Sequence, residues 1–252
     1  MTFFRADNLI INFGGIRAVD DVSFAVSKGE VFTIIGPNGA GKTTIFNLVS
    51  RIYEPSAGRL VFEDRDITNV PAHRIAALGI ARTFQNIELF EHATLLENLL
   101  LARHAHKKSH FFGELLFFPS VRQMEVEHRE AVERVIDFLN LQEYRDALIV
   151  NLPYGVRKVT ELARALCTGP KLLLLDEPSS GLNVEETEDM AFWIEDIKGL
   201  LGITVLMVEH DMKLVSAVSD RVLALNYGRP IATGTPREIQ NHPEVVRAYL
   251  GG

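Results

Sequence analysis

A glycine-rich segment near the N-terminus organises this chain: Gly36-Pro37-Asn38-Gly39-Ala40-Gly41-Lys42-Thr43-Thr44. The apolar, β-branched run at residues 31–35 precedes it and predicts a buried strand, and residues 45–49 predict the first turns of a helix. A strand, a glycine-rich loop and a helix in this order are the setting of a phosphate-binding P-loop.

The chemistry of this segment suits a nucleoside triphosphate. Its glycines let successive backbone N–H groups face one point, where the helix N-terminus adds partial positive charge and Lys42 adds a full one. The hydroxyl of Thr43 suits Mg²⁺, a hard cation that prefers oxygen ligands. The candidate nucleotide-binding residues are Gly36, Asn38, Gly39, Ala40, Gly41, Lys42, Thr43 and Thr44.

Strands that alternate with helices predict an α/β fold, a P-loop NTPase core with a mainly parallel sheet. Alternating polar and apolar positions at 3–12 and 18–26 predict an N-terminal antiparallel β-layer. Apolar runs at 171–175 and 204–208 predict two buried strands. The other expected elements are a short helix at 71–78 capped by Asn69, a strand at 80–84, a hairpin around 226–230, and helices at 185–201, 212–218 and 236–250.

The pattern becomes helical in the middle of the chain. Thr94 and Glu97 have the spacing of a capping box, and apolar residues three and four apart at 121–139 predict an amphipathic helix. A further helix is expected at 157–167. We therefore expect a single domain over 1–252, with a core formed by 1–90 and 169–252 and a helical subdomain at 91–168.

An insertion at 103–129 lies within the helical region. Its histidines, at 104, 106 and 110, lack a carboxylate or cysteine to complete a ligand set, so a solvated basic segment is favoured over a metal site. Its Phe/Leu run at 111–118 predicts a helix buried in the subdomain, and a surface that touches a membrane or partner is the alternative.

Composition limits the classes of protein to consider. The 252 residues include 47% hydrophobic and 23% charged residues, as in an ordinary globular chain with a sizeable core, and the net charge of −7 argues against a general nucleic-acid binder. The single Cys167 excludes an internal disulfide, fits a reducing compartment and is expected to be buried rather than catalytic. We find no signal peptide and no apolar run of the roughly 20 residues that a membrane span needs.

Two adjacent carboxylates follow the apolar run that ends at Leu175. Asp176 emerges at the carboxyl end of the predicted strand, where a carboxylate can organise Mg²⁺ and water beside a P-loop. Glu177 comes one residue later, where it can polarise the attacking water as a general base. A purely structural carboxylate pair is the alternative, which the P-loop makes less favourable.

Together these motifs resemble the ATP-binding subunits of ABC transporters over essentially the whole chain. Residues 36–44 resemble Walker A, residues 172–176 resemble Walker B, and residues 179–183 resemble the D-loop, with Asn183 where aspartate is common. The resemblance implies hydrolysis of ATP, with Glu177, His210 and Lys42 as catalytic residues and Mg²⁺ held by Thr43, Gln85 and Asp176. His210 matches the switch histidine, Gln85 the Q-loop glutamine, and Phe13 the aromatic residue that stacks on adenine.

The signature motif departs from the family's Leu-Ser-Gly-Gly-Gln, because this chain has Leu-Pro-Tyr-Gly-Val at 152–156. In the family, the serine hydroxyl and the glycine amides contact the γ-phosphate bound by the opposite subunit. Pro153 has neither a hydroxyl nor an N–H, so that contact is lost. The helix N-terminus and the amides of Tyr154 and Gly155 remain, and we expect a shared site that works with altered contacts.

Several stretches are similar to branched-chain amino acid importer ATPases of the LivG type: residues 80–85, the long insertion, Gly234-Thr235-Pro236 and Tyr249-Leu250-Gly251. The resemblance implies transmembrane permease subunits, a second ATPase subunit that is a copy or a paralogue, an extracytoplasmic binding protein acting indirectly, and a place on the cytoplasmic face of the membrane. Urea or amide importers and the lipopolysaccharide-export ATPase are alternatives within the family. We expect no residue of this chain to determine which solute is transported.

The permease is expected to sit in a groove near residues 85–101, against Ile87, Leu89, Phe90, Leu95 and Leu96. Two other classes of protein are weaker alternatives. A soluble ABC ATPase that acts on DNA or ribosomes usually has coiled-coil insertions or tandem cassettes, and this chain has neither. A P-loop kinase or GTPase would carry a lid or a guanine-reading Asn-Lys-x-Asp motif, which we do not find.

Overall fold

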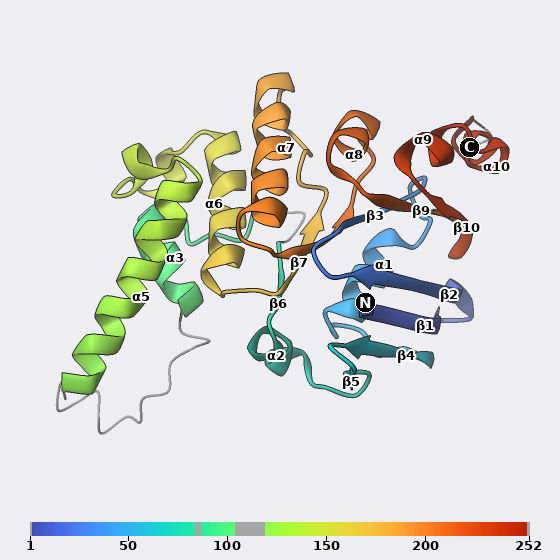
Figure 1. Ribbon diagram of the computed structural model, residues 1–252, viewed down its shortest axis with the longest axis horizontal. Helices are drawn as coiled ribbons and strands as arrows, with labels where there is room; N and C mark the ends of the chain where they lie inside the picture. The colour runs from blue at the N-terminus through green and yellow to red at the C-terminus, as the bar shows by residue number, and fades with distance from the viewer. Residues whose placement is uncertain (1, 84–86, 104–118, 251–252) are drawn as a thin grey trace. The chain divides into compact units, whose positions relative to one another are not determined.

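The computed structural model describes residues 2–83, 87–103 and 119–250 (Figure 1). The chain divides into two compact units, one formed by residues 1–85 with 171–252 and the other by residues 86–170. The boundaries expected from the sequence lie between residues 90 and 91 and between residues 168 and 169. The P-loop, Asp176, Glu177 and His210 all belong to the first unit, which is called the core unit below.

The core unit contains two sheets. The antiparallel sheet has the order β2-β1-β4-β5, and the six-stranded sheet has the order β10-β9-β3-β8-β7-β6, in which only the β9–β10 pair is antiparallel. The strands of the first sheet are β1 (Thr2–Phe13), β2 (Ile16–Ser27), β4 (Ala57–Phe62) and β5 (Arg65–Asp66). Those of the second are β3 (Val31–Ile35), β6 (Ile80–Arg82), β7 (Leu172–Asp176), β8 (Thr204–Val208), β9 (Arg221–Asn226) and β10 (Arg229–Gly234). These elements confirm the predicted α/β fold with its antiparallel β-layer.

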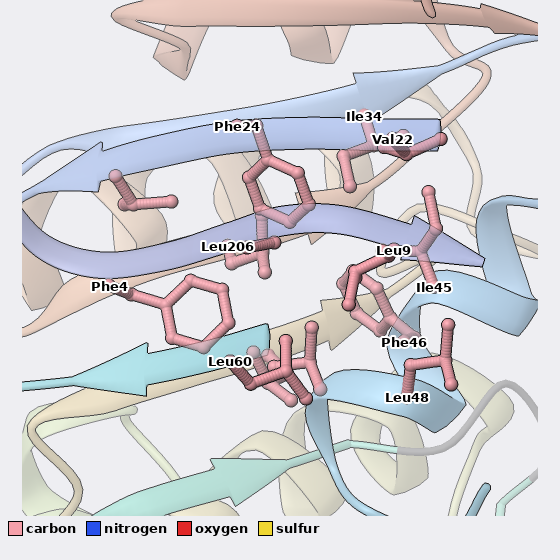
Figure 2. Packing of buried hydrophobic residues seen from close by; sticks show 14 of the residues in the cluster. Phe4, Leu9, Val22, Phe24, Ile34, Ile45, Phe46, Leu48, Leu60 and Leu206 are labelled. Carbon is pink, nitrogen blue, oxygen red and sulfur yellow. The ribbon is translucent and has the colours of Figure 1, made fainter. Parts of the chain in front are cut away.

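The helix after the P-loop, α1 (Lys42–Val49), packs in a hydrophobic cluster that both sheets share. Figure 2 shows Phe46 and Leu48 of this helix beside Leu60 and Leu9 of the antiparallel sheet, with Leu206 of β8 in the same cluster. Each fully buried side chain of this size contributes about 1.5–3 kcal/mol relative to exposure. The P-loop is therefore anchored at its helical end by one of the most buried elements of the fold.

The other helices of the core unit are α2 (Ala72–Ile75, continued by a 3₁₀ turn at Ala76–Leu78), α7 (Val184–Gly199), α8 (Met212–Val218), α9 (Pro236–Gln240) and α10 (Pro243–Leu250). Two expectations about helix ends are wrong. Asn69 does not cap α2, because Pro71 is its N-cap. The helix expected over 236–250 is two helices, since Pro243 lacks an N–H and disfavours helical backbone at the residue before it.

The helical unit contains α3 (Leu95–Ala102), α5 (Pro119–Phe138) and α6 (Tyr154–Cys167), with 3₁₀ turns at Gln142–Tyr144 and Ile149–Asn151. Thr94 and Glu97 form the predicted capping box of α3. Of the insertion, residues 104–118 lie outside the described part of the chain, and so do the expectations about its histidines and its Phe/Leu run. No helix within the described residues combines the length and the apolar character that a membrane crossing requires.

Of the five residues expected to line a groove for the permease, three are buried, so for these three the prediction is wrong. Leu89, Leu95 and Leu96 are buried within the helical unit, because they supply its core and not its surface. Phe90 is 61% exposed, and Ile87 is half-buried. An apolar residue in a short amphipathic segment cannot be assigned to a surface from its type alone.

Cys167, at the end of α6, should react very slowly with thiol reagents. Burial raises the pKa of its thiol to about 12, so almost none of it is the reactive thiolate near neutral pH. At pH 8 we expect iodoacetamide to label the folded protein at least about a hundredfold more slowly than the urea-unfolded chain. Mass spectrometry of the intact protein measures both rates. Equal rates in the two states would contradict the burial of this side chain.

Candidate active site

The P-loop requires glycine at Gly36 and Gly41 for reasons of space. A Cβ atom on Gly36 would lie 2.5 Å from the Leu225 carbonyl oxygen, and one on Gly41 would lie 2.7 Å from the Ala18 oxygen. Gly41, the N-cap of α1, also has a φ of 98°, which side chains disfavour. The backbone of β9 and of β2 thus approaches the loop so closely that any side chain at these positions would push it away.

The β9–β10 hairpin holds the P-loop from one side. The N–H of Gly228 donates to the carbonyl of Ala40 at 3.0 Å, and the N–H of Asp20 donates to the carbonyl of Gly228 at 2.8 Å. The Asp20 carboxylate accepts hydrogen bonds from Arg17 and Arg229, and these bonds hold its pKa below the usual range. The sequence gives no sign of this connection, since the hairpin lies almost 200 residues after the loop.

Lys42 is folded back onto the loop that it follows. Its ammonium group donates to the carbonyl oxygens of Gly36 at 2.7 Å and Pro37 at 3.2 Å. Burial lowers the pKa of Lys42, and the carboxylates of Glu177, Asp176 and Glu209 act in the opposite direction. The P-loop cation and these three carboxylates therefore share one electrostatic site.

Asp176 ends β7 and is held by a cation that the sequence did not point out. Its Oδ2 accepts a hydrogen bond of 2.7 Å from Arg82, which follows Ala81 on the neighbouring strand β6. The same guanidinium donates to Asn47 at 2.7 Å and to Ser50 at 2.9 Å, both on α1 or its C-cap. Arg82 thus links Asp176, at the end of the Walker B strand, to the helix that follows the Walker A segment.

The other oxygen of Asp176 fits a role near a metal ion. Its Oδ1 is buried and has no hydrogen-bond partner among the residues that the structure describes. Thr43 is exposed in the first turn of α1. A buried carboxylate oxygen with spare acceptor capacity, together with a hydroxyl on the P-loop helix, suits a hydrated Mg²⁺ bound to phosphates.

Glu177 and His210 face the same hollow as the P-loop. The hollow, about 400 Å³, is lined by Gly36, Pro37, Asn38, Glu177, His210 and Tyr249. Glu177 Oε1 lies 3.7 Å from His210 Nδ1. The backbone of Glu177 has a φ of 48°, in the left-handed region that is uncommon for non-glycine residues, and its N–H donates to the Val208 carbonyl at 2.9 Å. This turn directs a carboxylate toward the loop immediately after the buried strand ends.

Tyr249 is a component of this hollow that sequence reasoning missed as a site residue. It lies on α10 and lines the hollow together with Gly36. Burial raises the pKa of its hydroxyl, and the backbone N–H of Gly36 acts in the opposite direction. The C-terminal helix of the chain therefore reaches the root of the P-loop.

Two further predicted site residues, Phe13 and Gly155, are not among those that line this hollow. Phe13 ends β1, is 44% exposed, and meets Tyr53 edge-on with 5.2 Å between ring centroids, so an aromatic pair stands where one residue was predicted. Gln85 lies outside the described residues. Gly155 is buried in the first turn of α6, in the helical unit.

Comparisons with known proteins show the family to which this chain belongs. A family model described as "ABC transporter" matches residues 19–180, and one described as "Branched-chain amino acid ATP-binding cassette transporter" matches residues 229–252. The chain is 42% identical over 247 residues to the high-affinity branched-chain amino acid transport ATP-binding protein BraF of Pseudomonas aeruginosa, covering 98% of this chain and 97% of BraF. It is 40% identical over 245 residues to LivG of Escherichia coli K12, covering 97% and 96%.

A solved structure has the same fold. An ATP-binding cassette of an ABC transporter in its ADP conformation superposes with a TM-score of 0.87 at 33% identity, and the match covers 100% of both chains. A nucleotide-free cassette matches with a TM-score of 0.86 at 33% identity. With its P-loop, its Walker B carboxylates and these relatives, the chain belongs to the ABC transporter family as an ATP-binding ATPase subunit, similar over nearly its whole length to the branched-chain amino acid transport ATP-binding proteins.

Proposed function

We propose that this ATPase powers the uptake of branched-chain amino acids through a membrane permease, using Mg²⁺-ATP bound at the P-loop. The solute is suggested by the relatives named above and by the family match at residues 229–252. These favour branched-chain amino acids over urea, amides or lipopolysaccharide. The observation that carries the proposed chemistry is the hollow in which Glu177 and His210 face Gly36, Pro37 and Asn38.

The P-loop would bind the triphosphate. Its backbone N–H groups and the N-terminus of α1 favour phosphate, and the Lys42 ammonium would exchange its two carbonyl partners for phosphate oxygens. Phe13, with Tyr53 supporting it edge-on, offers an exposed aromatic surface for adenine.

Thr43, Asp176 and Gln85 would hold Mg²⁺, Asp176 through Oδ1, which has no hydrogen-bond partner among the described residues. Bound there, the ion would neutralise charge on the phosphates during transfer. Arg82 keeps the Asp176 carboxylate in one orientation by bonding its other oxygen.

Hydrolysis would use Glu177 as the general base. Its carboxylate would accept a proton from the water that attacks the γ-phosphate, and His210 would contact that phosphate and help to place the water. Glu177 is only 13% exposed on its side chain, whereas His210 is 55% exposed, so the base is sheltered and the histidine has freedom to move.

A second ATPase subunit, a copy or a paralogue, would complete each site with its signature segment. Helix α6 begins at Tyr154 with Pro153 as its N-cap, so the amides of Tyr154 and Gly155 lie at the positive end of the helix dipole. These donors would face the partner's γ-phosphate in a head-to-tail dimer. Closure of the dimer would drive the permease from the cytoplasmic face of the membrane, and a binding protein would deliver the solute from the other side.

Reconstitution with the permease that copurifies with this chain tests the proposal. Proteoliposomes that contain both, with ATP enclosed and the binding protein outside, should accumulate labelled leucine, isoleucine or valine and should not accumulate labelled urea. The matched control is the same complex carrying Lys42→Ala, which should accumulate neither. Uptake of urea without uptake of leucine would overturn the proposed solute, and ATP-independent uptake would overturn the proposed role of this subunit.

A further inference from the structure

A buried carboxylate next to His210 has no part in the mechanism above. Glu209 is completely buried, yet both of its oxygens are used. Its Oε1 accepts hydrogen bonds from the N–H of Ser179 at 3.0 Å and from the hydroxyl of Ser179 at 2.5 Å. Its Oε2 accepts from the N–H of His210 at 2.6 Å and the N–H of Asp211 at 3.1 Å.

We infer that Glu209 is a positioning residue, which fixes the switch histidine relative to the segment that follows the general base. Four donors converge on one carboxylate, two from each of two loops at the carboxyl ends of neighbouring strands β7 and β8. Burying a carboxylate is costly unless its oxygens are satisfied. Three main-chain N–H groups and one hydroxyl satisfy the oxygens of Glu209, and Oε2 also lies 3.6 Å from His210 Nδ1.

The inference rests on the proposed roles of Glu177 and His210. Ser179 lies two residues after Glu177 and begins the segment at 179–183 that resembles the D-loop. On the other side, the two N–H groups bonded to Oε2 fix the backbone from which the His210 side chain projects. A shift of Ser179, such as a second subunit would cause on docking, therefore moves His210 through Glu209. Because Glu209 is buried, it acts through His210 and does not touch substrate.

Glu209→Gln tests this role with almost no change in volume. An amide offers one acceptor oxygen, so the N–H donors of one of the two loops face an NH₂ group and lose their acceptor. We expect kcat for ATP hydrolysis to fall about tenfold to a hundredfold, because a displaced His210 side chain slows the reaction. KM for MgATP should change less than about threefold. Glu30→Gln is the matched control, since Glu30 precedes β3 at its opposite end and accepts a hydrogen bond from Arg221 at 2.8 Å.

A double-mutant cycle separates positioning from loss of fold. If Glu209 acts through His210, Glu209→Gln should cost little further rate in a His210→Ala background. Full additivity, a normal kcat in Glu209→Gln, or a fall in kcat matched by an equal fall in the folded fraction would each overturn the inference. If Glu209→Gln does not fold, Ser179→Ala, which removes only one hydroxyl bond, should lower kcat in the same pattern. Normal turnover in His210→Ala alone would instead contradict the proposed function.

Discussion

Glu177→Gln should lower the rate of ATP hydrolysis at least about a hundredfold and leave MgATP affinity within about threefold. The amide has nearly the size of the carboxylate but cannot accept a proton from water. The groups proposed to bind the nucleotide, the P-loop amides and Lys42, are unchanged. Loss of one negative charge beside Lys42 should, if anything, strengthen the hold on phosphate, because that carboxylate partly neutralises the ammonium.

Turnover is measured by phosphate release under saturating MgATP, and affinity by equilibrium titration with a fluorescent ATP analogue. Glu188→Gln is the matched control. It makes the same chemical change at an exposed carboxylate on α7, away from the hollow. A variant that turns over at the wild-type rate would remove Glu177 from the role of base. A variant that loses affinity as well as turnover would show that the side chain holds nucleotide.

The parts of the site that sequence predicts are those encoded in short segments. The P-loop and the Asp176-Glu177 pair each follow a continuous apolar strand, and a buried strand with polar residues at its carboxyl end can be identified without knowing its neighbours. His210 is different, because a lone histidine after strand β8 is uninformative until a family pattern gives it a place. The fold class follows from the same alternation of strands and helices.

The missed residues depend on contacts between distant segments. Arg82 is 94 residues from Asp176, Glu209 is 30 residues from Ser179, and Tyr249 reaches Gly36 from the other end of the chain. Nothing in the local sequence pattern distinguishes Arg82 or Tyr249 from ordinary surface or core residues. One signal was available: Glu209 is a charged residue directly after an apolar strand, and such a residue needs a partner.

The pairing of Arg82 with Asp176 has the largest expected effect on stability. Their side chains are 8% and 2% exposed, and the guanidinium also lies over the Phe46 ring, 5.5 Å from its centroid. Removing one partner of a buried ion pair leaves the other charge without compensation. We therefore expect Arg82→Met, which keeps most of the side-chain volume, to lower the free energy of unfolding by about 3–5 kcal/mol.

Urea denaturation followed by circular dichroism measures that loss, with Arg59→Met as the matched control. Arg59 pairs with Asp66 at 3.0 Å, but the two side chains are 62% and 50% exposed, so its loss should cost less than about 1 kcal/mol. Adding Asp176→Asn to Arg82→Met should recover part of the stability, because the uncompensated charge is then gone. A loss below about 1 kcal/mol in Arg82→Met, or a further loss in the double variant, would mean that Asp176 does not depend on Arg82 for its burial. The link between the two nucleotide-binding motifs would then have to run through the packing of α1 alone.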